Sequence, residues 1–275
     1  MPVTKQICYL GNFAPQHSTE SDLLWTLRDM GHIVEPLQEN QSSNAKILEA
    51  CSKTGTHLFL WTHTYGSDLE DRKPVLEELR KRGVVSASFH LDLFFGLDRE
   101  PMLDQHAFFK TDHFFGVDGS AEFKYKMHGV NHHFTWPAVK KASCYMANHD
   151  PNMASDVMFV GSTPYHKEWP YRPQLVQWLK TTYGDRFRKY GNPEPCIRGD
   201  MLNRAYGSAR VVVGDSLNPG FSYPFYVSDR VFETVGRGGF LIMPWIQGLD
   251  DQLKDGVHLR YYKFGDFKQL KELID

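Results

Sequence analysis

Short apolar runs alternate along the chain with longer segments whose apolar residues recur at helical spacing. The runs that predict strands are residues 6–10, 32–34, 57–61, 84–89, 108–110, 114–117, 156–160, 187–190, 209–214, 240–243 and 258–261. Helical spacing is found at residues 19–30, 44–51, 71–81, 171–180, 199–208, 229–235 and 267–273. This alternation predicts right-handed βαβ units and an α/β fold with mostly parallel sheets.

The pattern restarts after a polar stretch that has no periodicity. We therefore predict a first domain at residues 1–140, a linker at 141–154 and a second domain at 155–275. A chain of 275 residues suits two domains of ordinary size. No apolar run approaches the roughly 20 residues that a membrane-spanning helix needs.

Composition and charge narrow the function classes. The chain is 41% apolar, and its net charge of −2 gives no general field that would attract nucleic acid or an anionic membrane. The N-terminus lacks the charged and apolar regions of a signal peptide. The four cysteines are far apart and form no CxxC pair, so we expect a reduced, cytoplasmic protein.

The stretch at residues 226–251 predicts a loop, a short helix, a tight turn and a buried strand. Ser228 and Asp229 are residue types that cap a helix N-terminus, and the glycines at 236, 238 and 239 end the helix. A helix N-terminus attracts anions. Arg230 beside it suits a diphosphate, and Glu233 one turn later suits the paired hydroxyls of a ribose.

This stretch resembles the C-terminal half of GT-B glycosyltransferases, especially the family related to the spore-maturation protein CgeB. The matching residues are Arg230, Phe232-Glu233, Gly238-Gly239 and the apolar run at 240–242. The phrases LRDMGHIVEPL, TWPA and DVMFVG resemble others of the superfamily. The resemblance implies two Rossmann-like domains with mostly parallel sheets facing a cleft, with a hinge near residues 137–151.

The resemblance also implies an activity. It implies a metal-independent hexosyltransferase that moves a sugar from a nucleoside diphosphate sugar, UDP-sugar by default, to an unknown acceptor hydroxyl, with no further cofactor. Retaining members often carry two Glu residues with seven residues between them. Phe225 stands in the place of the first, so the resemblance does not carry a retaining mechanism over to this chain.

Predicted donor-binding residues lie mainly in the second half. Lys167 and Arg172 follow its first strand and suit the phosphates, Arg198 suits the base, and Tyr226 suits stacking near the phosphates. The full predicted set is Gly11, Gly161, Ser162, Lys167, Arg172, Arg198, Tyr226, Ser228, Asp229, Arg230 and Glu233.

Predicted catalytic residues lie in the first half, after strands whose carboxyl ends should share one edge of a sheet. An inverting transfer needs a group that accepts the proton of the acceptor hydroxyl. We predict Asp92 for this role, followed by His17 and His63, since histidine titrates near neutral pH. Two alternatives stay open: Asp92 caps the turn before Phe94, or the enzyme retains and none of the three acts as a base.

Other ligand classes have weaker support. His63 and the His132-His133 pair are possible metal ligands, but adjacent histidines point apart in a strand, and no HExxH or DxD motif is present. We therefore predict no metal. The absence of GxGxxG and P-loop motifs argues against NAD and ATP.

Two alternative functions remain. One is a glycosyltransferase that modifies a hydroxylated base in DNA, because a basic and aromatic cluster suits a nucleic acid strand. The cluster comprises Phe123, Lys124, Tyr125, Lys126, His128, His132, His133, Phe134 and Trp136. The other is a catalytically silent protein that binds a sugar nucleotide or acts as a scaffold, which the missing first Glu keeps open.

Overall fold

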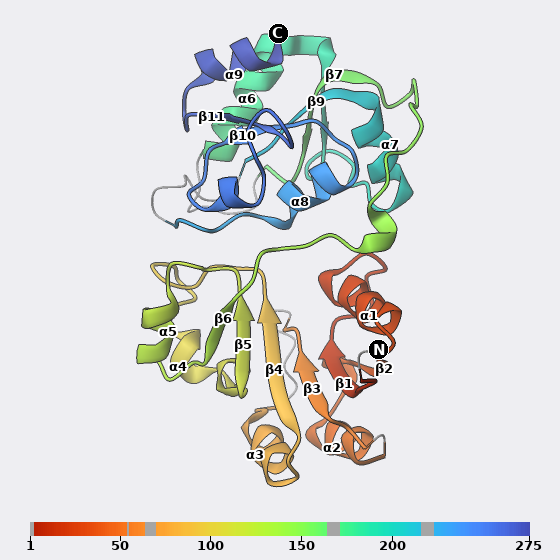
Figure 1. The fold of residues 1–275 in the computed structure, drawn as a ribbon, viewed down its shortest axis with the longest axis vertical. Helices are drawn as coiled ribbons and strands as arrows, with labels where there is room; N and C mark the ends of the chain where they lie inside the picture. Colours follow the sequence, from red (N-terminus) through yellow and green to blue (C-terminus); the bar gives the residue numbers. More distant parts are fainter. Residues whose placement is uncertain (1–2, 54, 64–69, 164–170, 216–222) are drawn as a thin grey trace. The chain divides into compact units, whose positions relative to one another are not determined.

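The computed structural model describes residues 3–53, 55–63, 70–163, 171–215 and 223–275. Contacts divide the chain into two compact units, at residues 1–135 and 136–275. Residues 141–154, which the sequence analysis treats as a linker, are grouped with the second unit. Each unit is built on one parallel sheet (Figure 1).

The first unit contains a six-stranded parallel sheet in the order β2-β1-β3-β4-β5-β6. Its strands are β1 (Gln6–Gly11), β2 (Ile33–Gln38), β3 (Leu58–Trp61), β4 (Val85–His90), β5 (His113–Gly116) and β6 (His132–Phe134). Its helices are α1 (Thr19–Asp29), α2 (Asn44–Lys53), α3 (Lys73–Lys81), α4 (Met102–Gln105) and α5 (Glu122–Met127), with 3-10 turns η1 (Glu39–Gln41) and η2 (Ala107–Lys110).

The second unit contains a five-stranded parallel sheet in the order β11-β10-β9-β7-β8. Its strands are β7 (Ser155–Val160), β8 (Phe187–Tyr190), β9 (Ala209–Val213), β10 (Leu241–Pro244) and β11 (Arg260–Tyr262). Its helices are α6 (Tyr171–Tyr183), α7 (Asp200–Ser208), α8 (Asp229–Gly236) and α9 (Phe267–Ile274), with 3-10 turns η3 (Lys141–Ser143), η4 (Gly184–Arg186) and η5 (Leu249–Asp251). The α/β class with two parallel sheets is thus confirmed.

The prediction of a strand at residues 108–110 is wrong. Phe108 and Phe109 belong to η2, where the His106 side chain accepts a hydrogen bond from the Phe108 N–H at 3.2 Å. Both rings are buried and pack edge-on against Phe114 of β5. A short apolar run indicates burial but does not distinguish a strand from a helical turn, and this one lies beneath the sheet.

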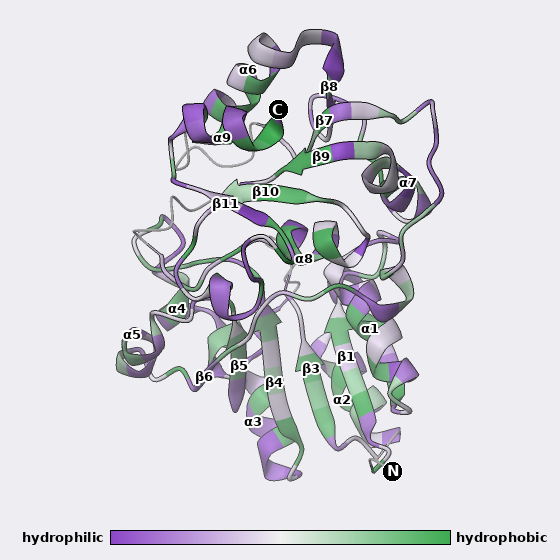
Figure 2. Cartoon of the chain, turned by 45° about the horizontal axis from the view of Figure 1, so that its top comes forward, coloured by the Kyte–Doolittle hydropathy of each residue, from purple (hydrophilic) through white to green (hydrophobic). Residues whose placement is uncertain are grey.

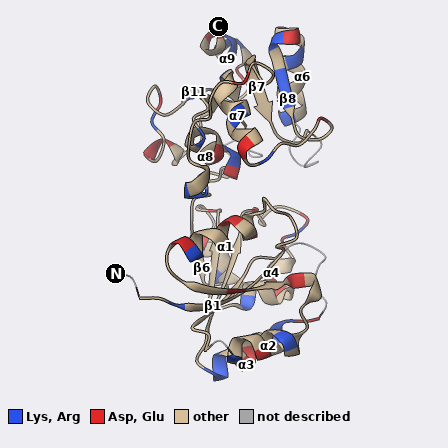
Figure 3. Ribbon diagram, turned by 90° about the vertical axis from the view of Figure 1, so that its right-hand side faces the viewer, with Lys and Arg blue, Asp and Glu red and all other residues tan. Residues whose placement is uncertain are grey.

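Apolar side chains concentrate along the strands, as the periodicity predicts; β1, β3, β9 and β10 are mostly hydrophobic (green in Figure 2). Lys and Arg residues are interspersed with Asp and Glu on the helices of both units (Figure 3). No helix within the described ranges has both the length and the apolar character needed to cross a bilayer.

The strand orders define where ligands should bind. In each sheet, two neighbouring strands are followed by connections that run to opposite sides, and a crevice forms outside the carboxyl ends of such a pair. In the first unit the pair is β1 and β3, and in the second it is β7 and β9. Gly161 follows β7 directly, and Asp215 lies two residues beyond β9.

Residues 136–147, the docked segment, lie closely against α7 and α8 of the second unit. A Cβ atom at Gly207 would lie 2.6 Å from the Ala147 carbonyl oxygen, and one at Gly236 would lie 2.7 Å from Val139 Cγ1. A Cβ atom at Gly238 would lie 2.8 Å from Met146 Cβ. Glycines therefore form the seat of this segment, because any larger residue would displace it.

Replacement of Gly207 by alanine separates packing from helix propensity. Propensity alone predicts stabilisation, by about 0.5–1 kcal/mol in a helix interior. The clash with the Ala147 carbonyl predicts the opposite, a loss of about 1–3 kcal/mol. Urea unfolding measures the sign, with Met201→Ala on the exposed side of α7 as a control. Increased stability in Gly207→Ala would contradict the claim that Gly207 is needed for the docked segment to pack against α7.

Candidate functional site

A buried ion pair lies at the carboxyl ends of β7 and β9. Arg172, in the first turn of α6, donates from Nε to Asp215 Oδ2 at 2.8 Å and from Nη1 to the Ser162 carbonyl at 3.1 Å. Both side chains are only 2% exposed. Within the part of the chain that the structure describes, Arg172 Nη2 and Asp215 Oδ1 have no hydrogen-bond partner. Each charge is tolerated in the interior because the other neutralises it.

Arg230 lies in the first turn of α8 and packs on the backbone of Gly161. A Cβ atom at Gly161 would lie 2.6 Å from Arg230 Nη1, so any other residue would displace the guanidinium from its present position. Burial lowers the pKa of Arg230, but Asp215 and Asp229 outweigh it and leave the pKa raised. The site thus presents a permanent cation beside a glycine backbone, an arrangement that suits a phosphate oxygen.

Glu233 lies one turn after Arg230 on α8. Burial and then Asp229 raise the pKa of its carboxyl group, whereas Arg237, Arg198 and Arg230 act in the opposite direction. Its Oε1 atom lies 3.5 Å from Arg237 Nη2. A partly buried carboxylate surrounded by cations is suited to accept hydrogen bonds from ligand hydroxyls.

The other predicted donor residues occupy different surroundings. Ser228 is the N-cap of α8, but its side chain makes no capping hydrogen bond, and Tyr226 is buried. Arg198 is exposed in the loop before α7. Gly11 ends β1 in the first unit. Lys167 lies outside the described residues.

Phe225, in the place of the first Glu of retaining enzymes, has a left-handed backbone with φ of +64°. Its N–H donates to the Gln247 carbonyl at 2.9 Å. Its ring lies against Gly248, where a Cβ atom would come within 2.1 Å of Phe225 Cδ1. The aromatic ring therefore ties this loop to the turn after β10, which is a packing role that a glutamate would not perform.

In the first unit, His63 forms a buried pair with Glu39. His63 follows β3 and is 6% exposed, while Glu39 follows β2 and is fully buried. His63 Nδ1 lies 2.6 Å from Glu39 Oε1, which also accepts from Trp61 Nε1 at 2.7 Å. The carboxylate fixes the imidazole so that Nδ1 carries a proton and Nε2 is the basic nitrogen. Glu39 was not predicted from the sequence.

Asp92 and two further histidines surround this pair, whereas His17 does not. The His90 Nδ1 atom accepts from the Asp92 N–H at 3.1 Å and lies 3.9 Å from Asp92 Oδ2. The His106 ring stacks on His63 with centroids 4.6 Å apart. His17 is exposed in the loop before α1. The structure therefore places Asp92, His63 and Glu39 around His90, whereas His17 has no recorded contact with the His63–Glu39 pair among the described residues.

Two buried histidines should make the first unit sensitive to acid. Burial lowers the pKa of His90 to about 4, and burial together with His133 lowers the pKa of His132 to about 4. The unfolded chain binds these protons near pH 6.5, so stability is lost as pH falls from 6.5 towards 4. The loss between pH 7 and pH 5 is about 2 kcal/mol per histidine.

Unfolding of the first unit in urea at the two pH values measures this loss. His132→Phe should reduce the pH dependence, because it removes one buried titrating group from β6. His17→Gln is the matched control, since that side chain is exposed. Equal stability at pH 7 and pH 5 in the unmodified chain would contradict the prediction.

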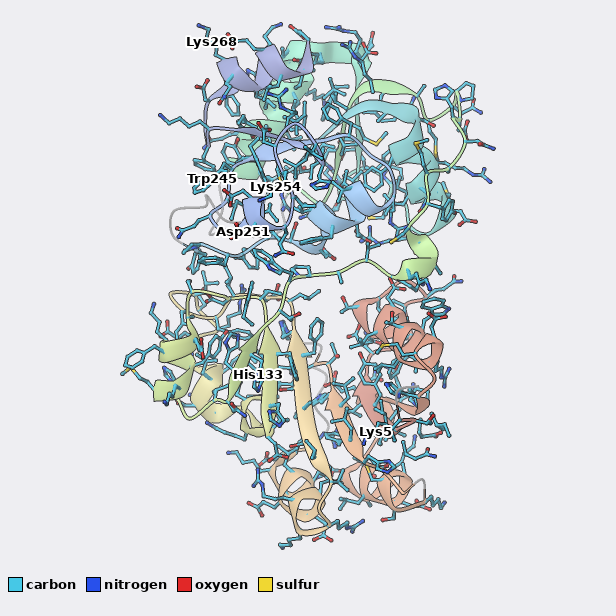
Figure 4. All side chains as sticks on the ribbon, viewed as in Figure 1. Lys5, His133, Trp245, Asp251, Lys254 and Lys268 are labelled. Carbon is cyan, nitrogen blue, oxygen red and sulfur yellow. The ribbon has the colours of Figure 1, made fainter. Side chains whose placement is uncertain are left out.

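The basic and aromatic cluster is not one surface. Tyr125 and His132 are buried and stack on each other with ring centroids 4.1 Å apart. Trp136 belongs to the second unit, where it contacts Phe232. His133, labelled on β6 in Figure 4, bonds to His113 at 2.9 Å.

Four members of that cluster are exposed: Phe123, Lys124 and Lys126 on α5, and Phe134 on β6. Among the residues that the structure describes, no three His, Cys, Asp or Glu side chains form a cluster that could hold a metal ion.

Comparisons with known proteins agree with this architecture. A family model described as glycosyl transferase-like matches residues 172–275, within the second unit. No curated protein has significant sequence similarity to the chain.

Similar solved structures include sucrose-phosphate synthase from Thermosynechococcus elongatus, with a TM-score of 0.59, 14% identity and coverage of 98% of this chain and 88% of that one. The Anabaena protein HepE in complex with UDP and glucose has a TM-score of 0.55 at 12% identity, with coverages of 98% and 89%.

An α-glucosyltransferase in complex with UDP-glucose and DNA containing an abasic site has a TM-score of 0.61 at 9% identity. The matched region spans 99% of this chain and 91% of that one. At such identities the similarity shows the fold. The chain thus has the GT-B glycosyltransferase fold, and its residues 172–275 match the glycosyl transferase-like family model.

Proposed function

We propose that this protein is a glycosyltransferase that moves a hexose from a nucleoside diphosphate sugar, with UDP as the default nucleotide, to an acceptor hydroxyl. The observation that carries the proposal is the placement of Arg230 and Glu233 one turn apart at the start of α8, beside Gly161 at the end of β7. The CgeB-like branch of the superfamily remains a prediction from the motif of that helix.

The donor is proposed to bind along this helix. The diphosphate lies at the helix N-terminus, where Arg230 and the positive end of the helix dipole stabilise its negative charge. The ribose hydroxyls donate to Glu233. Arg172 is proposed to act through Asp215 and the Ser162 carbonyl, which it holds in place. UDP or UDP-glucose is present in several similar structures, which supports UDP as the default.

We propose that His63 is the general base of an inverting transfer. Its Nε2 atom would accept the proton of the acceptor hydroxyl, and Glu39 would stabilise the imidazolium that forms. Asp92 then has a secondary role through its contact with His90. The diphosphate leaves with its charge compensated by Arg230, so the proposed mechanism requires no metal.

Titration calorimetry with UDP, GDP, ADP, dTDP and NAD tests the donor proposal. The chain should bind one nucleoside diphosphate more tightly than NAD. Binding of NAD without binding of any of the nucleoside diphosphates would contradict the proposal. Release of UDP from UDP-glucose only when an acceptor is supplied would distinguish an enzyme from a catalytically silent binding protein.

A DNA acceptor is a second candidate, supported by the similar α-glucosyltransferase structures that contain DNA. In this chain its surface would include α5, where Phe123, Lys124 and Lys126 are exposed, and the exposed Phe134 at the end of β6. Binding to DNA through these lysines would weaken steeply with salt. Salt-independent or undetectable DNA binding would leave the acceptor among other hydroxyl compounds.

A further inference from the structure

A chain of polar contacts leads from Glu233 to the docked segment within the second unit. Glu233 Oε1 lies 3.5 Å from Arg237 Nη2, and Arg237 Nη1 donates to Asn203 Oδ1. The Asn203 amide nitrogen donates to the carbonyls of Ser143, at 3.0 Å, and Tyr145, at 2.7 Å. The sequence did not predict a role for Arg237 or Asn203, because the two residues lie far apart in the sequence and belong to no recognisable motif.

Arg237 is a buried cation with a restricted choice of partners. It is 4% exposed, and its guanidinium can only donate hydrogen bonds, never accept them. It is the C-cap of α8, four residues after Glu233, which is a favourable position for a cation and a favourable order for the pair. A buried cation is stable only when a carboxylate or polar acceptors compensate it, so Arg237 and Glu233 constrain each other.

Asn203 determines which way the guanidinium faces. Its side chain is fully buried on α7, and both amide hydrogens have protein acceptors on the docked segment. Only its Oδ1 atom remains for Arg237. With Nη1 held by Asn203, the planar guanidinium presents Nη2 to Glu233. The orientation of the Glu233 carboxylate therefore depends on Arg237, which contacts it, and on Asn203, which contacts Arg237.

We propose that Arg237, oriented by Asn203, is a positioning residue that holds the Glu233 carboxylate in place for the ribose hydroxyls of the donor. This inference rests on the proposed function. Arg237 does not itself touch the nucleotide. Its loss leaves the glutamate present, but free to rotate and to take up a proton in its buried surroundings, so that it no longer accepts the ribose hydrogen bonds.

The affinity ratio between UDP and 2′-deoxy-UDP isolates this role, because it reports only on the ribose hydroxyl. A hydrogen bond to a charged group corresponds to about 10- to 100-fold in affinity, so the unmodified chain should prefer UDP by that factor. Arg237→Gln and Asn203→Leu should each reduce the preference for UDP over 2′-deoxy-UDP at least about 5-fold, because each weakens the hydrogen bond between Glu233 and the ribose. The preference for UDP over uridine, which reports on Arg230, should stay unchanged.

Three comparisons make the result specific. In a Glu233→Ala background, Arg237→Gln should cause no further change in the ratio, since it acts only through the glutamate. Lys271→Gln removes a cation four residues before its carboxylate partner Asp275 on α9 and should leave the ratio unchanged. Arg237→Lys keeps the charge and the aliphatic stem and should retain part of the preference for UDP. It replaces Arg237→Gln as the test variant if Arg237→Gln does not fold.

The outcomes separate the two levels of inference. An unchanged ratio in folded Arg237→Gln or Arg237→Lys would overturn the positioning role while leaving the donor site intact. Failure of the unmodified chain to bind either nucleotide would overturn the proposed function, and this inference with it. A ratio that falls equally in Lys271→Gln would show a general effect of charge and would also reject the positioning role.

Discussion

Replacement of His63 by alanine is expected to lower the rate of sugar transfer by about 10²- to 10⁴-fold, the usual contribution of a general base. Donor affinity should change little, because His63 lies in the first unit and Arg230 and Glu233 lie in the second. Glu39→Gln should also lower the rate, by at least about 10-fold. It keeps the shape of the side chain but removes the charge that stabilises protonated His63.

Asp92→Asn and His17→Ala complete this series. His17 is exposed and should be dispensable, whereas Asp92 contacts His90 and should have an intermediate effect. Product configuration at the anomeric carbon should be inverted. A retained configuration, or full activity in folded His63→Ala with a large loss in Asp92→Asn, would show that His63 is not the base.

Replacement of Arg230 by alanine is expected to weaken UDP binding by about 10- to 100-fold, because hydrogen bonds to charged groups contribute about 1.5–3 kcal/mol. Binding of uridine, which lacks phosphate, should be nearly unchanged. The fold should persist, since Asp215 keeps Arg172 as its counter-ion. Calorimetric titration of UDP and uridine measures both affinities.

Arg260→Ala is the matched control for Arg230→Ala. Arg260 belongs to the same unit and forms an ion pair with Asp255, but its side chain is 41% exposed and the pair lies at β11. It should leave both affinities unchanged. Equal losses for uridine and UDP in Arg230→Ala would mean that this arginine does not act on the diphosphate.

The sheets and the α8 region follow from local sequence patterns. Apolar runs predicted the strands of both sheets apart from β6. Ser228 and Asp229, both residue types that cap helices, predicted the start of α8, and its N-cap is Ser228. Burial was predictable wherever the period of apolar residues was clear. The prediction of a strand at residues 108–110 was wrong because burial alone does not specify an extended backbone.

Contacts between distant segments were not predictable. Glu39 and His63 follow β2 and β3, which flank β1 in the sheet, and their meeting depends on this strand order and on no local motif. The glycine seat of the docked segment likewise joins α7, α8 and residues 139–147. One sequence shows the residue types, but the pairings arise only when parallel strands bring their carboxyl ends to the same edge.

A crystal structure of the chain with UDP tests the donor site most directly. The diphosphate should lie within hydrogen-bond distance of the Arg230 guanidinium and the first turn of α8, and a ribose hydroxyl should donate to Glu233. UDP bound elsewhere, or bound at α8 with its ribose directed away from Glu233 and its phosphates away from Arg230, would contradict the proposed function.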